Sequence, residues 1–255
     1  MKPADDYDHI ALVIPAYNEA ASLRQVATAA LAQLRWVIVV DDGSTDDTAQ
    51  SVAGLPLTLL RLSPNQGKAQ ALWHGMQHAL QHGATAVVTM DADGQHRAED
   101  IPRLLEAWKV YPDHLIIGSR LHDRSQFPVS RYRANRFANF WVAWAAGYPV
   151  SDSQSGFRVY PANLLRAYQA VQRKSRGFVF ESAIIIEAGR RGYATLAVPI
   201  PAIYFASARK SYFRPVLDIL RITRMVAIVL IQRGLCPVCL WRSLRPPPLY
   251  HPDKQ

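Results

Sequence analysis

Long apolar runs are missing from this sequence of 255 residues. The best contender for a membrane span, Met225 to Ile231, is far shorter than the roughly 18–20 residues that a spanning helix needs. The first residues, Met1 to Asp6, are acidic and contain no apolar core, so no secretory signal is predicted. We therefore expect a cytoplasmic protein, which leaves peripheral attachment to a membrane open.

Cysteine is also scarce. The two cysteines, Cys236 and Cys239, form a single Cys-Pro-Val-Cys motif. A structural zinc ion takes four ligands, and no second cysteine pair exists, although His251 lies downstream. We expect two reduced thiols in a basic tail, with a functional role for the pair as the alternative.

Acidic residues are rare near the end of the chain. The formal net charge is +9, and the last 48 residues, 208–255, hold nine Lys and Arg against two Asp, which accounts for seven of those charges. The composition, 49% hydrophobic and 19% charged, is that of a globular protein. The basic residues form no recognisable RNA- or DNA-binding module, so no nucleic acid partner is predicted.

Short apolar runs alternate with segments of helical periodicity over most of the chain. This alternation predicts an α/β fold with a mainly parallel sheet that has helices on both faces. The expected strands are 10–15, 36–40, 57–62, 87–90, 114–120 and 194–204, and the stretch 152–160 is a loop that enters a further strand. The expected helices are 19–34, one that Ser44 or Thr45 can cap, 69–81, 98–110, 131–148 and 178–190.

Two helical segments have surfaces that suit either a protein core or a membrane. Segment 131–148 is basic at its start and aromatic later, and Trp141 and Trp144 could pack in the core or lie at the headgroup level. Segment 210–232 interleaves arginines with apolar residues. It could lie on an anionic bilayer, or it could pack against the domain or a second copy of the chain.

Polar residues follow the expected strands directly, and parallel strands bring such ends to one edge of a sheet. Asp91 and Asp93 are one residue apart after an apolar strand, and Gln95 adds a third oxygen donor. Hard cations such as Mg²⁺ or Mn²⁺ suit these ligands. The alternative is an ordinary polar turn containing Asp-Gly.

The motifs in order resemble those of the family-2 glycosyltransferases, whose catalytic domain has the Rossmann-like GT-A fold, and most closely the dolichyl- or polyprenyl-phosphate sugar synthases. The resemblance covers about residues 8–205, so we expect a GT-A domain over 1–207 and a basic amphipathic helix with a tail, predicted to associate with membranes, over 208–255. The matching stretches are Ile14-Pro15-Ala16-Tyr17-Asn18-Glu19, Val40-Asp41-Asp42-Gly43-Ser44-Thr45-Asp46, Asn65-Gln66-Gly67-Lys68, Asp91-Ala92-Asp93-Gly94-Gln95-His96, Gly118-Ser119-Arg120 and Ser155-Gly156-Phe157-Arg158.

The resemblance implies roles for individual residues. The donor nucleotide sugar would be bound by Pro15, Tyr17, Glu19, Val40, Asp41, Asp42, Lys68, Asp91, Ala92, Asp93, Arg120 and Arg131. Asp91, Asp93 and Gln95 would hold Mg²⁺ or Mn²⁺, and Asp93 and Arg120 would act in catalysis. Many polyprenyl-phosphate synthases carry a mobile loop that ends in Gly-X-Ser-Lys. Here Tyr212 stands where that lysine would be, and Arg209 and Lys210 could supply the charge.

The resemblance further implies an inverting, single-displacement transfer to a lipid-linked acceptor at the inner face of the plasma membrane. A polyprenyl phosphate is already ionised and needs no general base, whereas a lipid or acyl hydroxyl needs one. Asp152 and Glu181 are the candidate bases, and a purely structural role for each is the alternative. A sugar nucleotidyltransferase and a non-catalytic membrane adaptor are the alternatives from other classes. The sequence predicts no oligomeric state.

Overall fold

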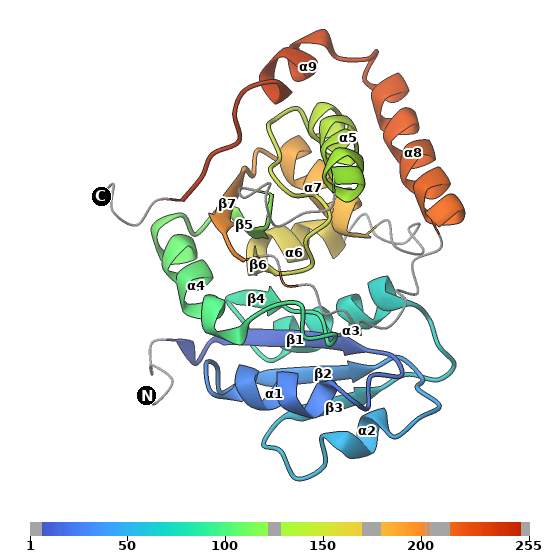
Figure 1. Cartoon of the computed structure of the whole chain (residues 1–255). Coiled ribbons are helices and arrows are strands. Elements are labelled where there is room, and N and C mark those ends of the chain that lie inside the picture. The colour runs from blue at the N-terminus through green and yellow to red at the C-terminus, as the bar shows by residue number, and fades with distance from the viewer. Residues whose placement is uncertain (1–6, 122–128, 170–179, 202, 204–214, 251–255) are drawn as a thin grey trace.

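One seven-stranded sheet runs through the molecule, as a computed structural model shows (Figure 1). The structure describes residues 7–121, 129–169, 180–201, 203 and 215–250, with the backbone alone for 129–131 and 215–221. The strands are β1 (Ile10–Ala16), β2 (Val37–Asp41), β3 (Thr58–Arg61), β4 (Ala86–Thr89), β5 (Leu115–Ser119), β6 (Arg158–Pro161) and β7 (Thr195–Pro199). Their order across the sheet is β3-β2-β1-β4-β6-β5-β7.

The direction of each strand decides at which edge of the sheet its loops lie. β6 is antiparallel to both of its neighbours, β4 and β5, and the other pairings are parallel. The carboxyl ends of the parallel strands therefore lie along one edge of the sheet, and the amino end of β6 arrives at the same edge. This confirms the predicted α/β fold with a mainly parallel sheet.

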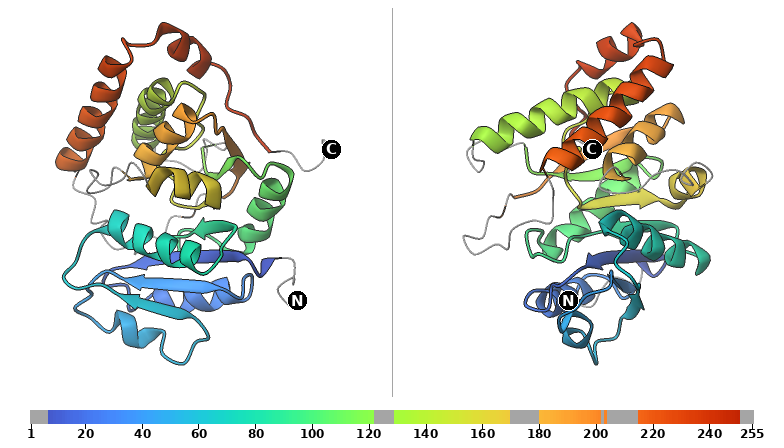
Figure 2. Two further views of the ribbon diagram at one scale, coloured as in Figure 1. Left: turned by 180° about the vertical axis from the view of Figure 1, so that it is seen from behind. Right: turned by 90° about the vertical axis from the view of Figure 1, so that its right-hand side faces the viewer.

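Helices cover both faces of the sheet (Figures 1 and 2). They are α1 (Leu23–Leu31), α2 (Thr48–Ser51), α3 (Lys68–Gln81), the 3₁₀ turn η2 (Ala98–Asp100) with α4 (Ile101–Val110), α5 (Val129–Ala146), α6 (Ala162–Gln169), α7 (Phe180–Arg190), α8 (Pro215–Gln232) and α9 (Pro237–Ser243). Sequence analysis predicted neither α6 nor α9.

The core has two parts because side chains alternate across a strand. In β1, Ala11 and Val13 face a core shared with α3 and α5 to α8, whereas Leu12 and Ile14 face a core shared with α1 and α4. These strands are buried on both faces, which explains why they appear in the sequence as continuous apolar runs.

The described half of α8 packs against the domain. Met225, Val226, Val229 and Leu230 belong to or contact the first core, and Val226 and Leu230 are only 3% exposed. The apolar stripe that sequence analysis offered to a bilayer is thus largely used for folding in this part of the helix. Among the described residues, no helix is long and apolar enough to cross a membrane.

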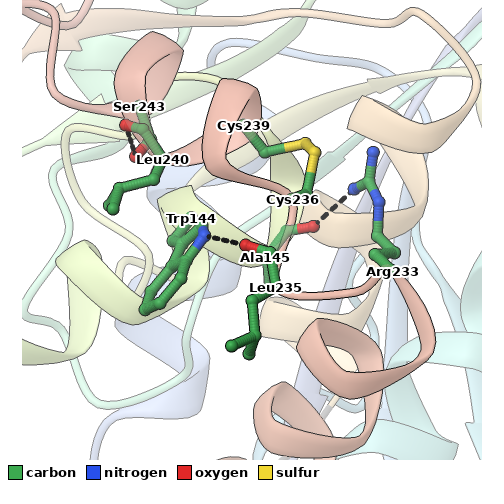
Figure 3. The surroundings of a disulfide bond; sticks show 8 residues. All are labelled: Trp144, Ala145, Arg233, Leu235, Cys236, Cys239, Leu240 and Ser243. Atoms are coloured by element: carbon green, nitrogen blue, oxygen red, sulfur yellow. Dashed lines mark hydrogen bonds between the residues drawn. A yellow bond between two sulfur atoms is a disulfide. The ribbon is translucent and has the colours of Figure 1, made fainter.

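The two cysteines are bonded to each other, which corrects the expectation of reduced thiols. Cys236 and Cys239 form a disulfide at the start of α9 (Figure 3). Cys236 is the residue before the first turn of this helix, so its side chain lies within reach of a residue three positions later. The expectation was wrong because it did not place the two cysteines at the start of a helix.

Candidate active site

The carboxyl edge of the sheet gathers most of the predicted site residues. Tyr17 and Glu19 follow β1, Asp42 follows β2, Asp91 follows β4 and Arg120 follows β5. The loop that precedes β6 brings Asp152 to the same edge, because β6 runs in the opposite direction. Two clusters result, one beside β1 and β2 and one beyond β4.

Asp42 organises the first cluster. Its carboxylate accepts hydrogen bonds from Asn65 Nδ2 at 3.0 Å, from Gln66 N at 2.8 Å and from Gly67 N at 2.7 Å. Burial raises the pKa of Asp42, and the backbone hydrogen bonds from Gln66 and Gly67 oppose that rise. The carboxylate therefore fixes the loop that leads into α3.

The neighbouring turn is equally constrained. Asp41 accepts a hydrogen bond from Ser44 N at 2.9 Å and pairs with Arg61 Nε at 3.2 Å. Gly43 has a φ of +73°, and a β-carbon there would lie 2.9 Å from Asn65 N. Because a side chain would both strain the backbone and collide with it, glycine is required at this position.

The remaining predicted donor residues of this half differ in exposure. Pro15 and Val40 lie opposite each other in β1 and β2, and both are buried. A ligand could meet Val40 only through its backbone. Tyr17 and Glu19 are half-buried just beyond β1, where their side chains can reach a ligand.

Lys68 is the centre of the second cluster. Its ammonium lies 2.8 Å from Asp91 Oδ1 and 3.0 Å from Glu181 Oε1. Burial alone would lower the pKa of Lys68, but the charges of Asp91 and Glu181 outweigh it and raise that pKa above its ordinary value. Burial alone would raise the pKa of Asp91, but Lys68, with smaller contributions from His96 and Arg120, lowers it to about 2.

Asp93 lies beside this cluster and its side chain reaches solvent. Desolvation by the surrounding protein raises its pKa, and the negative charge of Asp91 raises it further. Gln95 N donates to Asp93 Oδ1 at 3.0 Å, and Ala92 between the two acids is buried. Asp91 and Asp93 thus place two like charges close together.

These residues fit a hard divalent cation. Carboxylate and amide oxygens are the ligands such ions prefer, and a cation would relieve the repulsion that raises the pKa of Asp93. Within the described ranges, no three His, Cys, Asp or Glu side chains form a group that could hold a metal ion. A cation here would take Asp91, Asp93 and Gln95, with its remaining positions filled from outside the chain.

Asp152 and Arg120 pair at the same edge. Asp152 is fully buried, and its Oδ2 lies 3.6 Å from Arg120 Nε and accepts a hydrogen bond from Arg120 N at 3.3 Å. Its Oδ1 accepts hydrogen bonds from Gln154 N at 3.2 Å and Ser155 N at 3.1 Å. Both oxygens of Asp152 are therefore engaged in holding its own loop and Arg120.

Arg158 supports the candidate site, and sequence analysis included it in a motif without giving it a role. This arginine is fully buried and donates to three carbonyl oxygens, those of Ser155 at 2.7 Å, Ser153 at 2.9 Å and Glu181 at 2.8 Å. It therefore joins the Asp152 loop to the start of α7. The available signal was an arginine inside an apolar strand, since a buried guanidinium needs several acceptors.

Gly156 allows this loop to approach Asp91. A β-carbon at Gly156 would lie 2.8 Å from Asp91 Oδ2, and its carbonyl accepts a hydrogen bond from Thr89 Oγ1 at 2.7 Å. Glycine at position 156 therefore leaves the room that the Asp91 carboxylate occupies.

Three of the predicted residues are not placed at the site by the structure. Arg131 lies in the first turn of α5, where only the backbone is described, and Arg209 and Lys210 lie outside the described residues. The structure does bring together Lys68, Asp91 and Glu181, and it pairs Arg120 with Asp152. Sequence analysis named all five residues but neither of these groupings.

Known proteins resemble most of this chain. The family model of glycosyl transferase family 2 matches residues 11–168. A UDP-N-acetylglucosamine–dolichyl-phosphate N-acetylglucosaminyltransferase of Methanococcus voltae is 30% identical over 217 residues, which are 76% of this chain and 86% of that protein. An undecaprenyl-phosphate mannosyltransferase of Micrococcus luteus is 32% identical over 202 residues, 74% of this chain and 81% of that protein.

Solved structures support the fold. The glucosyl-3-phosphoglycerate synthase of Mycobacterium tuberculosis, in complex with Mn²⁺, uridine diphosphate and phosphoglyceric acid, superposes with a TM-score of 0.61. The two chains are 23% identical, and the match covers 88% of this chain and 78% of that one. This similarity shows that the two chains share the GT-A fold.

Proposed function

The chain belongs to glycosyl transferase family 2 and is an enzyme that transfers glycosyl groups, and we propose that its acceptor is a polyprenyl phosphate. In this proposal it moves a sugar from a nucleotide-sugar donor by a single inverting displacement. The relatives named for dolichyl phosphate and undecaprenyl phosphate support this choice of acceptor.

One observation carries the choice of acceptor. Asp152 and Glu181 are the candidate general bases, and the structure pairs Asp152 with Arg120 and Glu181 with Lys68. Both oxygens of Asp152 already accept hydrogen bonds from the backbone, and one oxygen of Glu181 lies 3.0 Å from the Lys68 ammonium, so each carboxylate already has a structural partner. A phosphate acceptor is ionised before it arrives and needs no base, so this site suits a phosphate better than a hydroxyl.

The remaining residues divide between donor and acceptor. Tyr17, Glu19, Asp41 and Asp42 would border the nucleotide with Pro15 and the backbone of Val40 and Ala92. Lys68 and Arg120 would face the phosphates, joined in the proposal by Arg131, Arg209 and Lys210. Arginine and lysine side chains at such positions stabilise charge that grows in the transition state.

A divalent cation, Mg²⁺ or Mn²⁺, completes the proposal. Asp91, Asp93 and Gln95 would hold it, and the donor set of two carboxylates and an amide suits a hard ion. Such an ion neutralises the negative charge that the departing nucleoside diphosphate acquires. Asp93 is the more available ligand because Asp91 is paired with Lys68.

We place the reaction at the inner face of the plasma membrane. An acceptor with a long polyprenyl chain is held in a bilayer, and the relatives named for undecaprenyl and polyprenol phosphates support a membrane substrate. The chain would then act as a peripheral protein.

The test is a transfer assay with the full chain, a panel of nucleotide sugars, Mn²⁺ and two acceptors. One acceptor is a polyprenyl phosphate and the other is the matching polyprenol, which carries a free hydroxyl. We expect a glycosylated lipid and released nucleoside diphosphate with the phosphate alone. Asp93→Ala should abolish transfer, while Asp113→Ala, a change at an exposed acid beyond α4, should leave it intact.

Two further variants test the proposal that the reaction uses no general base. Asp152→Asn and Glu181→Gln should each retain substantial turnover with the phosphate if neither residue removes a proton. Transfer to the polyprenol alone would refute the proposal. So would a large loss of turnover in either variant while folding and donor affinity are preserved.

A further inference from the structure

Exposed apolar side chains are concentrated at one end of the molecule. Of the eleven large hydrophobic residues that are exposed within the described ranges, nine belong to α5 or to residues 228–249. These nine are Phe137, Phe140, Ile228, Ile231, Leu235, Val238, Trp241, Leu244 and Leu249, and the other two, Val110 and Tyr111, lie at the end of α4. Helices α5, α8 and α9 lie together at the end of the molecule remote from β3 (Figures 1 and 2).

An aromatic ladder runs along one side of α5, from the exposed Phe137 and Phe140 to the half-buried Trp141 and Trp144. Phe137, Phe140, Trp141 and Trp144 are three or four residues apart, so they share one side of the helix. Their rings contact in sequence, with centroids 6.1 Å apart for Phe137 and Trp141 and 5.5 Å apart for Trp141 and Trp144. Phe137 is 68% exposed and Phe140 is 38% exposed, and contiguous exposed apolar side chains of this kind are typical of interaction surfaces.

The turn between α8 and α9 is fixed to the end of this ladder. Trp144 Nε1 donates to the carbonyl of Leu235 at 2.9 Å, and Arg233 donates to the carbonyl of Ala145 at 2.8 Å (Figure 3). The disulfide of Cys236 and Cys239 closes this turn, and a β-carbon at Gly147 would lie 3.3 Å from the Cys239 sulfur. Helix α9 is therefore anchored beside α5.

The segments that carry these nine side chains contain no acidic residue. Residues 129–146 and 228–250 include neither Asp nor Glu. Their arginines with described side chains are Arg133, Arg136, Arg233, Arg242 and Arg245. Arg245 lies over the ring of the exposed Trp241, 4.4 Å from its centroid. Large aromatic side chains beside arginines are typical of surfaces that bind at the headgroup level of an anionic bilayer.

We propose that the exposed side of α5, α9 and residues 228–235 is a docking surface for an anionic lipid bilayer. The surface suits a bilayer better than a second copy of the chain, because two copies would bring arginines against arginines with no acid to pair them. The proposal rests on the proposed function, since a lipid-linked acceptor is what brings the chain to a membrane. Sequence analysis offered segments 131–148 and 208–255 to a membrane, and the structure narrows that contact to the exposed side chains of α5, α9 and residues 228–235.

The docking surface is also joined to the active site through α5. Asn139, on the same helix as the ladder, donates to the carbonyl of Ser151 at 2.6 Å and accepts from Ser153 N at 2.8 Å. These bonds hold the loop that carries Asp152 and, through it, Arg120. A bilayer that touches the outer side of α5 would therefore lie one helix away from the groups proposed to face the acceptor phosphate.

The test is co-sedimentation of the full chain with phosphatidylcholine vesicles that contain about one third phosphatidylglycerol. We expect the triple variant Phe137→Ser, Trp241→Ser, Leu244→Ser to reduce vesicle affinity at least about tenfold. The matched control is Val110→Ser with Tyr111→Ser, which removes two exposed apolar side chains outside the surface and should leave affinity unchanged. Arg242→Gln with Arg245→Gln should weaken binding to these vesicles and leave binding to pure phosphatidylcholine unaltered.

Equal vesicle affinity of the wild type and the triple variant would overturn the proposal, as would a wild type that does not bind vesicles. Analytical ultracentrifugation tests the alternative occupant. If the wild type is a dimer, the triple variant is a monomer and vesicle binding is unaffected, the surface belongs to a second copy of the chain. A short-chain polyprenyl phosphate in solution, without vesicles, separates this inference from the proposed function. The triple variant should use that acceptor at the wild-type rate. If the wild type cannot use the soluble acceptor but the triple variant still loses vesicle binding, the polyprenyl phosphate acceptor is refuted and the docking surface stands.

Discussion

The two halves of the candidate active site are built from different kinds of contact. Beside β1 and β2, Asp42 is held mainly by backbone N–H groups of the loop before α3. Beyond β4, the acids are held by long cationic side chains, with Lys68 between Asp91 and Glu181, and Arg120 on Asp152. The first half is a frame made of backbone, and the second is a network of charges.

This difference has consequences for how each half responds to change. Backbone donors stay in place as long as the loops do, so the first half is ready for a ligand before it binds. Ion pairs can exchange partners, so the second half can release Asp91 or Lys68 to a ligand of the opposite charge. In the proposed function, the donor nucleotide would meet a rigid surface, whereas the departing diphosphate and the acceptor would meet an adjustable one.

The largest effect is expected at Arg158, because three buried carbonyl oxygens accept hydrogen bonds from this one side chain. Arg158→Met removes the donors to the carbonyls of Ser153, Ser155 and Glu181 and leaves these oxygens in the interior. The free energy of unfolding should fall by about 3 kcal/mol or more. Urea titration measures it, and Arg166→Met on the exposed side of α6 is the control, expected within about 0.5 kcal/mol of the wild type. A similarly small change in Arg158→Met would show that water replaces the guanidinium without cost.

The frame half was far easier to predict from sequence than the network half. Strands such as 10–16 and 37–41 are buried on both faces, so their apolar runs and the polar residues that end them were visible in the sequence. Parallel order then placed Asp42 and Asp91 at one edge. The helix at 162–169 was missed because its apolar positions, Leu164, Leu165 and Tyr168, span little more than one turn.

The network half depends on contacts that no local pattern encodes. The antiparallel direction of β6 could not be predicted, because burial sets the apolar pattern of a strand and does not reveal its direction. That direction brings Gly156 against Asp91 and lets Arg158 reach α7. The pairing of Lys68 with Glu181 joins residues more than a hundred positions apart, so it forms only once the whole sheet and its helices have assembled.

A second, smaller effect is expected from crowding Asp91. Gly156→Ala places a methyl group 2.8 Å from Asp91 Oδ2, so the carboxylate must move away from its position. Displacements of this kind at a reacting centre lower kcat by roughly 10- to 100-fold. Steady-state kinetics measures this loss, and thermal unfolding provides the control, since the backbone at Gly156 does not have a positive φ and the fold should persist. Wild-type turnover in a folded variant would show that the position of Asp91 is not critical.

The frame can be tested at Asp42, where a milder change is expected. Asp42→Asn keeps one acceptor oxygen but turns an NH₂ group toward one of the N–H donors of Asn65, Gln66 and Gly67. The loss of a charge-assisted bond should raise the donor KM by about fivefold to tenfold, equivalent to about 1 kcal/mol. Asp47→Asn, at an exposed position of the same turn region, should leave KM unchanged. An unaltered KM in Asp42→Asn would mean that the loop holds its shape without the carboxylate.

The smallest effect is expected at Lys68, where one substitution should strengthen the binding of Mn²⁺ and weaken that of the donor. Lys68→Gln removes the ammonium 2.8 Å from Asp91 and so frees this carboxylate for a cation. Mn²⁺ alone, followed by electron paramagnetic resonance without any donor, should bind about threefold more tightly, because a positive charge next to the ligands is gone. The donor KM should rise, because the same ammonium is proposed to face its phosphates. Lys109→Gln, at an exposed lysine on α4, should change neither value. Weaker Mn²⁺ binding in Lys68→Gln would mean that Lys68 holds the carboxylates in place for the cation rather than competing with it, and the network would then be as rigid as the frame.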